Sequence, residues 1–214
     1  MVRPATFVER RIPKLTDLFG VVEQASVHLR GWDFPFAERS ASGVRLPSGV
    51  DWVGCEIDWN HYLESWRLYQ SGQFVDVAGY HHDWRDQSNM WPGAYDPSNS
   101  LLGVGDIVNS FIEIFEFAAR FAFGSAGDDF IHVEIILYGL RNRLLVLDDP
   151  SRMPFFREYR CNIDEYPQSF DMSRIELKAN TTALAEKALL DLFQHFNWDA
   201  PLEIIRNYHQ QLRR

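Results

Sequence analysis

The stretch that decides the fold is "HYLESWRLYQSGQFVDVAGYH", residues 61–81. Apolar and polar residues alternate on both sides of Ser71 and Gly72, as is typical of strands buried on one face. A two-residue turn at Ser71 and Gly72 places Arg67 opposite Asp76, which is a favourable cross-strand pair. The stretch therefore predicts an antiparallel hairpin. The apolar side chains expected to point to one face are Trp66 and Leu68, with Val75 and Val77 on the returning strand.

The same periodicities predict the remaining elements. The other strands expected are residues 51–59, 130–139, 142–149 and 156–164. The helices expected are residues 16–30, residues 106–123, residues 182–196 and a last helix opened by Pro201. This order predicts one α+β domain, 1–214, with one or two mostly antiparallel sheets, a central buried helix and a C-terminal helix pair within 181–214. A duplicated unit of one helix and three strands is suggested by the halves 15–83 and 105–165.

The composition limits the classes of function. The net charge is −9, from 30 acidic and 21 basic residues, and the basic residues gather towards both ends. An acidic body repels phosphate, which disfavours sequence-independent binding of nucleic acid. Two distant cysteines, Cys55 and Cys161, predict neither a disulfide framework nor a zinc ribbon. Because no signal peptide or membrane span is evident, we expect a cytoplasmic protein.

Three stretches together resemble a known family: "LRGWDFPF" (29–36), "WRLYQSGQFV" (66–75) and "LLDLFQHFNWDAPLEII" (189–205). They are similar to the region that accompanies the AlbA-type domain in bacterial Schlafen-like putative DNA-binding proteins. That domain itself is not evident here, so the resemblance transfers no nucleotide-binding or DNA-binding residue. It implies a bacterial accessory domain that stands alone and acts with other proteins, in regulation or in antiviral defence.

Aromatic residues suggest an interaction surface. The long segment 84–101 carries two tryptophans and a tyrosine, and loops of this length inside a compact domain are often functional. Exposed tryptophans are typical anchors of protein interfaces. An ordered connection that folds back over the core as a lid explains the same residues. The candidate interaction residues are Trp32, Phe34, Trp84, Trp91 and Tyr95.

Weaker patterns point to metal-dependent chemistry. Glu176 and Lys178 form the E-x-K pair of many metal-dependent nucleases, in which an acid binds metal and a lysine steadies the attacking water. Asp164 or Asp171 could supply the second acid. His132 and Glu134 share one strand face, and a half-solvated strand explains them equally well.

One further pattern, a pair of glycines before a helix, is assigned to ordinary structure. Gly103 and Gly105 precede a helix without the third glycine of a dinucleotide fingerprint, so we expect a normal helix entry.

The histidines of "GYHHDWRD" (79–86) raise the question of a metal site. In the predicted hairpin register His61 pairs with His82 on one sheet face, and Asp83 lies beside them. Two imidazoles and a carboxylate could hold zinc. A one-residue slip separates this pair, however, so we predict a polar strand end without a tight metal site.

These observations favour a non-catalytic protein–protein interaction or regulatory domain, with other proteins or a second copy as partners. A metal-dependent hydrolase or nuclease that uses acids and histidines at strand ends is the alternative. A small-ligand sensor closed by the aromatic segment is a third class. No cofactor, nucleic acid or membrane is expected to bind.

Overall fold

The computed structural model describes residues 1–59, 62–84, 100–149 and 152–211; the side chains of Trp84 and Gln211 lie outside the description. The chain forms two compact units. Unit 1 consists of Met1–Gly79, Glu113–Ile135 and Ser169–Thr182, and unit 2 of Tyr80–Ile112, Ile136–Gln168 and Ala183–Arg214. Each unit draws on both of the suggested halves, so the single domain and its duplication remain predictions.

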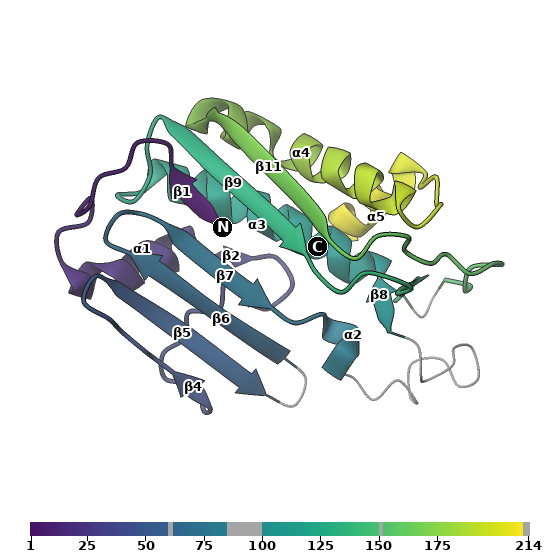
Figure 1. Cartoon of the computed structure of the whole chain (residues 1–214), viewed down its shortest axis with the longest axis horizontal. Coiled ribbons are helices and arrows are strands. Elements are labelled where there is room, and N and C mark those ends of the chain that lie inside the picture. Colours follow the sequence, from purple (N-terminus) through teal and green to yellow (C-terminus); the bar gives the residue numbers. More distant parts are fainter. Residues whose placement is uncertain (60–61, 85–99, 150–151, 212–214) are drawn as a thin grey trace. The chain divides into compact units, whose positions relative to one another are not determined.

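Most of a mostly antiparallel sheet lies in unit 1, as the α+β prediction required, and only the end of β9 and the start of β11 belong to unit 2. The seven strands follow the order β11-β9-β1-β7-β6-β5-β4 (Figure 1). Their bounds are β1 Val2–Pro4, β4 Val44–Arg45, β5 Trp52–Trp59, β6 Tyr62–Tyr69, β7 Phe74–Ala78, β9 Phe130–Leu137 and β11 Tyr166–Ser173. A separate two-stranded sheet pairs β2 (Val27–His28) with β3 (Asp33–Phe34).

The predicted hairpin exists as β6 and β7, but its register is shifted by one residue. The loop holds three residues, because the Tyr69 N–H donates to the Gln73 carbonyl at 3.0 Å and Gly72 adopts a positive φ of 85°. A type I turn followed by a left-handed glycine builds such loops. Asp76 therefore lies opposite Trp66, and not opposite Arg67.

The shift exchanges the faces of β7, since one residue of slip turns every side chain over. Phe74 joins Trp66 and Leu68 on the buried face, whereas Val77 is 65% exposed. The prediction that Val75 and Val77 share the face of Trp66 is therefore wrong.

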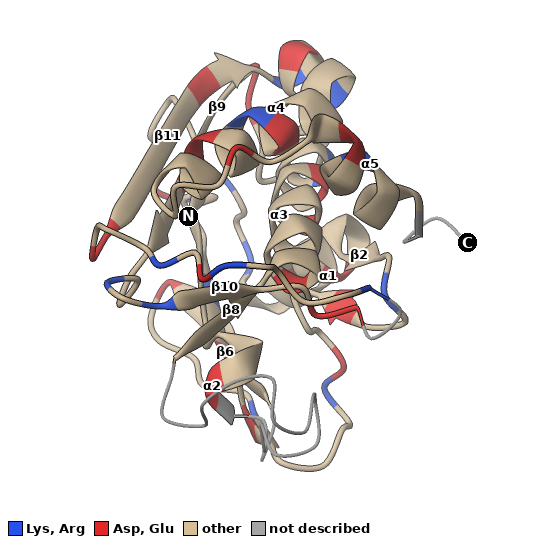
Figure 2. Cartoon of the chain, turned by 90° about the vertical axis from the view of Figure 1, so that its right-hand side faces the viewer, with Lys and Arg blue, Asp and Glu red and all other residues tan. Residues whose placement is uncertain are grey.

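Two helices supply the core of the units. α1 spans Leu18–Ala25 after a short 3-10 turn, η1 (Leu15–Asp17), and ends five residues earlier than predicted because β2 follows. α3 spans Val104–Phe123; in Figure 2 it is mostly tan, since its charged side chains are few. Phe111 in unit 2 and Phe115 in unit 1 are almost completely buried, which confirms that α3 is a core helix.

Unit 2 contains two short strands that pair in parallel. They are β8 (Leu101–Gly103) and β10 (Leu144–Val146), which form their own sheet. A four-residue helix, α2 (His81–Trp84), precedes them along the chain. The expected strand 142–149 is present only as the shorter β10, which pairs with β8 and not with the preceding strand β9. Residues 156–164, expected to form a strand, make only one isolated bridge, between Arg160 and Leu144. The next strand along the chain is β11, which begins at Tyr166.

The last two helices confirm the C-terminal helix pair. α4 spans Arg174–Gln194 and has a non-helical break at Asn180. It therefore begins eight residues before the predicted start. α5 spans Leu202–Gln211, directly after Pro201. Among the described residues, no helix has both the length and the apolar character of a membrane span.

Candidate metal centre

Two carboxylates meet in unit 2 where its parallel strands end. β8 runs into α3, so Asp106 lies in the first turn of that helix. Asp148 lies two residues after the end of β10. Because Leu144 pairs with Leu101 in a parallel ladder, the carboxyl ends of both strands lie at the same edge. The topology therefore brings together two acids that are 42 residues apart in the sequence.

Asp148 caps α3. Its Oδ1 accepts a hydrogen bond from the Gly105 N–H at 2.7 Å, and its Oδ2 accepts one from the Asp106 N–H at 2.8 Å. The first N–H groups of a helix lack partners within the helix, and a carboxylate there is favoured by the helix dipole. Asp106, where the helix was expected to begin, is thus part of the capped turn, and the cap comes from a distant segment.

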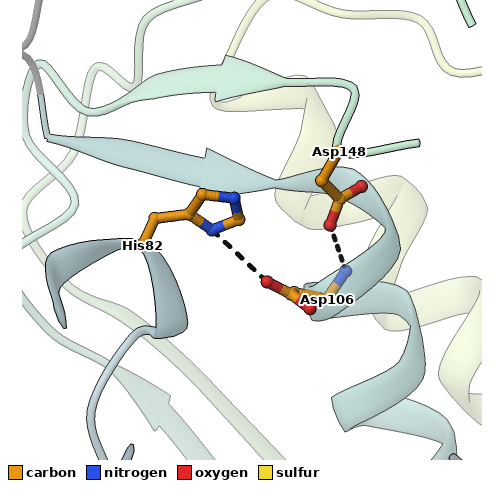
Figure 3. Close-up of side chains that lie close together, drawn as sticks. All are labelled: His82, Asp106 and Asp148. Carbon is orange, nitrogen blue, oxygen red and sulfur yellow. Dashed lines mark hydrogen bonds and ion pairs between the residues drawn. The ribbon is translucent and has the colours of Figure 1, made fainter. Parts of the chain in front are cut away.

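His82 completes the cluster from α2. Its side chain is 2% exposed, and its Nδ1 lies 3.3 Å from Asp106 Oδ2 (Figure 3). His82, Asp106 and Asp148 each offer one ligand atom, and these three atoms all lie within 4.8 Å of one another. His81 Nδ1 also lies 3.3 Å from Asp106 Oδ2, with 35% of its side chain exposed. The cluster therefore holds one buried imidazole, two carboxylates and a second imidazole at its more open side.

Two glycines make room for this arrangement. A Cβ atom at Gly103 would clash with Asp148 Oδ2 and with the ring of His82. A Cβ atom at Gly105 would lie 2.8 Å from Asp148 Oδ1 and 2.8 Å from the ring of Tyr208. The stretch "LLGVGDIV" is therefore more than a helix entry, because its glycines allow a histidine and a carboxylate to approach the backbone.

Arg143 holds α2 in place. Its guanidinium donates to both oxygens of Asp83 at 2.6 and 3.0 Å and to the Leu101 carbonyl at 2.8 Å. The same group stacks over the Tyr80 ring, 4.3 Å from its centroid. A buried arginine that makes a bidentate pair fixes geometry well. Asp83 is therefore turned to Arg143, and this contact anchors the helical turn that carries His82.

The electrostatics of the cluster favour a bound cation. Burial raises the pKa of the Asp148 carboxyl, and the charge of Asp106 adds to that rise, whereas the two backbone N–H groups oppose it. A divalent cation between the two carboxylates would relieve both the repulsion and the cost of burial.

The spacing of the ligand atoms suits a transition metal. Zinc lies about 2.0–2.2 Å from imidazole nitrogen and carboxylate oxygen, so ligand atoms around one ion lie about 3–4 Å apart. The spacing of 3.3 Å between His82 and Asp106 fits this range, whereas the three ligand atoms together lie within the wider limit of 4.8 Å, so a bound ion would draw them closer. Imidazole favours zinc and similar ions over Mg²⁺ and Ca²⁺, which prefer oxygen ligands only.

The neighbourhood of Asp148 contains a tyrosine hydroxyl without a partner. Tyr208 of α5 is 5% exposed, and its hydroxyl has no hydrogen-bond partner in the part of the chain that the structure describes. Burial raises the pKa of Tyr208, and the charge of Asp148 adds to this. The Arg152 guanidinium lies over the tyrosine ring, 4.8 Å from its centroid. The cluster is therefore bordered by a potential hydrogen-bond donor and by a cation.

The residues of the nuclease pattern lie in a different context. Glu176 and Lys178 lie in α4, where residues two apart point to different sides of the helix. Lys178 stacks over the Phe123 ring at 4.9 Å, and both belong to unit 1. Asp164 is exposed and belongs to unit 2. Asp171, the other acid considered, pairs with His132 at 2.9 Å. Glu176 and Lys178 therefore lie on a helix, and not on a strand beside a second acid.

The aromatic candidates are partly described. Trp32 is half-buried against Phe36, Trp59 and Tyr62, and Phe34 packs on Phe117 within unit 1. Both therefore contribute to the packing of their own unit. The predicted contacts of the Trp84 side chain, Trp91 and Tyr95 fall outside the described residues.

The predicted histidine pair does not form as a strand pair. His82 lies in α2, beyond the end of β7 at Ala78, and His61 lies outside the described residues. The acids near His82 are Asp106 and Asp148, and the sequence patterns single out neither of them as a ligand. One signal could have found them, since each acid follows a short apolar stretch, and such stretches can pair in parallel.

Comparison with models of protein families, with curated proteins and with solved structures gives no match. The resemblance to the region of Schlafen-like proteins therefore remains a prediction from the three quoted stretches. The assignment of a function rests on the geometry of the site.

Proposed function

We propose that the protein binds a divalent transition-metal ion through His82, Asp106 and Asp148 and uses it for hydrolysis. The observation that carries the proposal is the convergence of these three ligand atoms within 4.8 Å, with the imidazole almost completely buried. This is a metal-dependent form of the hydrolase alternative, with ligands that the sequence patterns had not combined.

The number of ligands supports a catalytic site rather than a structural one. Structural zinc sites use four protein ligands, whereas catalytic sites use three and keep a position open for water. The described residues supply three. A metal ion bound there lowers the pKa of its water to near neutrality.

His81 is the candidate base of such a site. Its Nδ1 lies 3.3 Å from Asp106 Oδ2, and its side chain is partly exposed to solvent. An imidazole that is open to solvent and oriented by a carboxylate is suited to accept a proton from a reacting group. Tyr208 and Arg152 border the other side of the cluster, where they can donate to an oxyanion.

The test is a calorimetric titration of Zn²⁺, Mn²⁺ and Mg²⁺ into protein stripped with a chelator. Wild type should bind one zinc or manganese ion per chain with sub-micromolar affinity and should bind magnesium far more weakly. His82→Ala and Asp106→Asn should lose more than the roughly 10–100-fold that removal of an outer-shell partner costs. His132→Ala is the matched control, because it removes a histidine from a His–Asp pair of unit 1. Equal zinc affinity in wild type and His82→Ala would contradict the proposal.

A second function, interaction with another protein, is supported by an exposed segment of unit 2. In residues 152–160, Met153 is 76% exposed and Phe156 is 100% exposed. Arg157 directly follows Phe156, and Arg160 lies three residues further along an otherwise acidic chain. Phenylalanine, methionine and arginine are enriched in interfaces. The partner that fits is a protein with an apolar pocket and an acidic rim.

This second function predicts a partner that depends on Phe156. A cross-linking pull-down with wild type should retain one partner that Phe156→Ala loses, and zinc binding should be equal in both. The same captured proteins with both forms would contradict it.

A further inference from the structure

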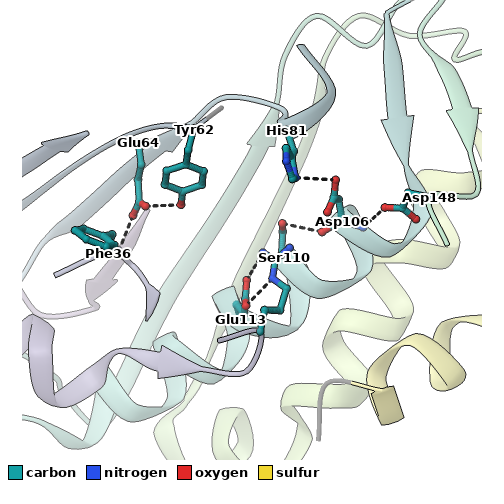
Figure 4. A network of polar contacts seen from close by, with 9 residues as sticks. Phe36, Tyr62, Glu64, His81, Asp106, Ser110, Glu113 and Asp148 are labelled. Carbon is teal, nitrogen blue, oxygen red and sulfur yellow. Dashed lines mark hydrogen bonds and ion pairs between the residues drawn. The ribbon is translucent and has the colours of Figure 1, made fainter. Parts of the chain in front are cut away.

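Two carboxylates lie on one face of neighbouring strands in the sheet of unit 1. Glu64 of β6 is 1% exposed, whereas Asp76 of β7 is half-buried, with its Oδ1 atom buried. Asp76 lies diagonally opposite Glu64, because Glu64 pairs with Ala78 and Trp66 pairs with Asp76. Glu64 accepts a hydrogen bond from the Phe36 N–H at 3.1 Å and another from the Tyr62 hydroxyl (Figure 4). Diagonal neighbours on one face of an antiparallel pair are within reach of long side chains, so this register allows the two carboxyls to approach each other.

Such a pair cannot be ionised twice without a large cost. Each buried carboxylate loses its hydration, and two like charges at this distance repel each other in a medium of low dielectric constant. A hydrogen bond between two carboxyls also requires a proton on one of them. Asp76 Oδ1 is buried and has no hydrogen-bond partner among the described residues, so none of their donors compensates for its burial.

Few other charged groups face the pair. The titratable or charged groups on the elements that pack around it are Cys55 of β5, Tyr62 of β6, the Met1 ammonium, Glu134 of β9, Glu113 of α3 and Arg30. The ammonium donates to the Glu134 carbonyl at 2.7 Å, and burial lowers its pKa. Arg30 is engaged with both oxygens of Glu113, at 2.9 and 2.6 Å. The ammonium therefore offsets part of the charge of Asp76.

We propose that Glu64 and Asp76 share one proton at neutral pH and that this buried acid pair makes the stability of unit 1 depend on pH. Glu64 keeps its acceptor roles towards Phe36 and Tyr62 while the shared proton bridges it to Asp76. Loss of this proton leaves two carboxylates in the core and weakens the packing between β6 and β7.

The sign of the pH dependence follows from linkage. Burial raises the pKa of both carboxyls, and for Glu64 the charge of Asp76 adds to the rise. A group whose pKa is higher in the folded state contributes stability below its unfolded pKa and loses it as pH rises through the folded pKa. The free energy of unfolding of unit 1 should therefore fall as pH rises from acid to alkaline values.

The test compares urea unfolding of wild type, Glu64→Gln and Asp76→Asn from about pH 5 to about pH 9. Glutamine and asparagine replace the protonated acid with a neutral group of the same shape. Wild type should lose stability towards alkaline pH, and each variant should show a smaller loss. Glu9→Gln, an exposed position of unit 1, should follow the wild-type profile.

Infrared spectroscopy gives a second readout that does not depend on stability. Wild type at neutral pH should show the carbonyl band of a protonated carboxylic acid, and Glu64→Gln should lack it. If one variant fails to fold, the other and the wild-type band still decide. Absence of the band in wild type, or parallel pH profiles for wild type and both variants, would overturn the proposal.

Discussion

Asp148 has two proposed roles, as the cap of α3 and as a metal ligand. Replacing it by asparagine separates them, because the cap stabilises the protein without metal, whereas the ligand role contributes only when metal is bound. Without metal, asparagine keeps an oxygen for one of the two backbone N–H groups that Asp148 binds at 2.7 and 2.8 Å. The loss of a cap costs about 0.5–2 kcal/mol, so we expect about 1 kcal/mol here. In a chain of this size that lowers the Tm by about 2–4 °C.

With zinc the difference should grow. A ligand that binds only the folded state stabilises it by about 2.7 kcal/mol at about 100 times its Kd. That corresponds to a rise of about 5–11 °C for wild type. Asp148→Asn should show little of this rise, because it lacks the anionic ligand. The assay is thermal unfolding in chelator and in excess zinc, with Asp149→Asn, the neighbouring acid, as the control that keeps the rise. A zinc-dependent rise in Asp148→Asn equal to that of wild type would refute the assignment of Asp148 as a ligand.

Three further substitutions test the core, the space around the site and the support of α2. Phe115→Ala should cost about 3–5 kcal/mol in urea unfolding, since its side chain is completely buried, whereas Phe123→Ala, at a side chain 46% exposed, should cost far less; equal costs would contradict the core assignment. Gly103→Ala should abolish zinc binding in calorimetry, because its Cβ atom would displace His82 and Asp148. Gly20→Ala, which has open space around it, should bind zinc as wild type does. Retained affinity in Gly103→Ala would show that the site tolerates the displacement. Asp83→Asn should weaken zinc binding about 10–100-fold without removing a ligand, as loss of an outer-shell support does, and an unchanged affinity would show that Asp83 does not position α2.

The elements of the hairpin could be predicted from the sequence, but its register could not. Apolar residues occupy both faces at the start of the returning strand, where Phe74 and Val75 are adjacent. Alternation alone therefore fits either register. The register is set by the left-handed conformation of Gly72, which lengthens the loop by one residue. That single residue also decides that Asp76 lies on the same face as Glu64.

The candidate site depended on a contact that no local pattern contains. The sequence predicts His82 as a possible ligand but places it on a strand, whereas β7 ends at Ala78 and His82 lies in α2. The acids that meet it are brought together by the parallel pairing of β8 and β10, which are only three residues long each. Similarly, β11 was missed because "YPQSFDMS" contains a proline and few apolar residues, and its strand conformation comes from its place in the sheet.

The most direct test of the metal centre is the zinc X-ray absorption spectrum of the protein after one equivalent of zinc has been added and unbound metal removed. A site made of His82, Asp106 and Asp148 predicts a first shell of nitrogen and oxygen at about 2.0–2.2 Å, with scattering from one imidazole and none from sulfur. His82→Ala should lose the imidazole scattering. A shell that contains sulfur, or two or more imidazoles that persist in His82→Ala, would contradict this account of the site.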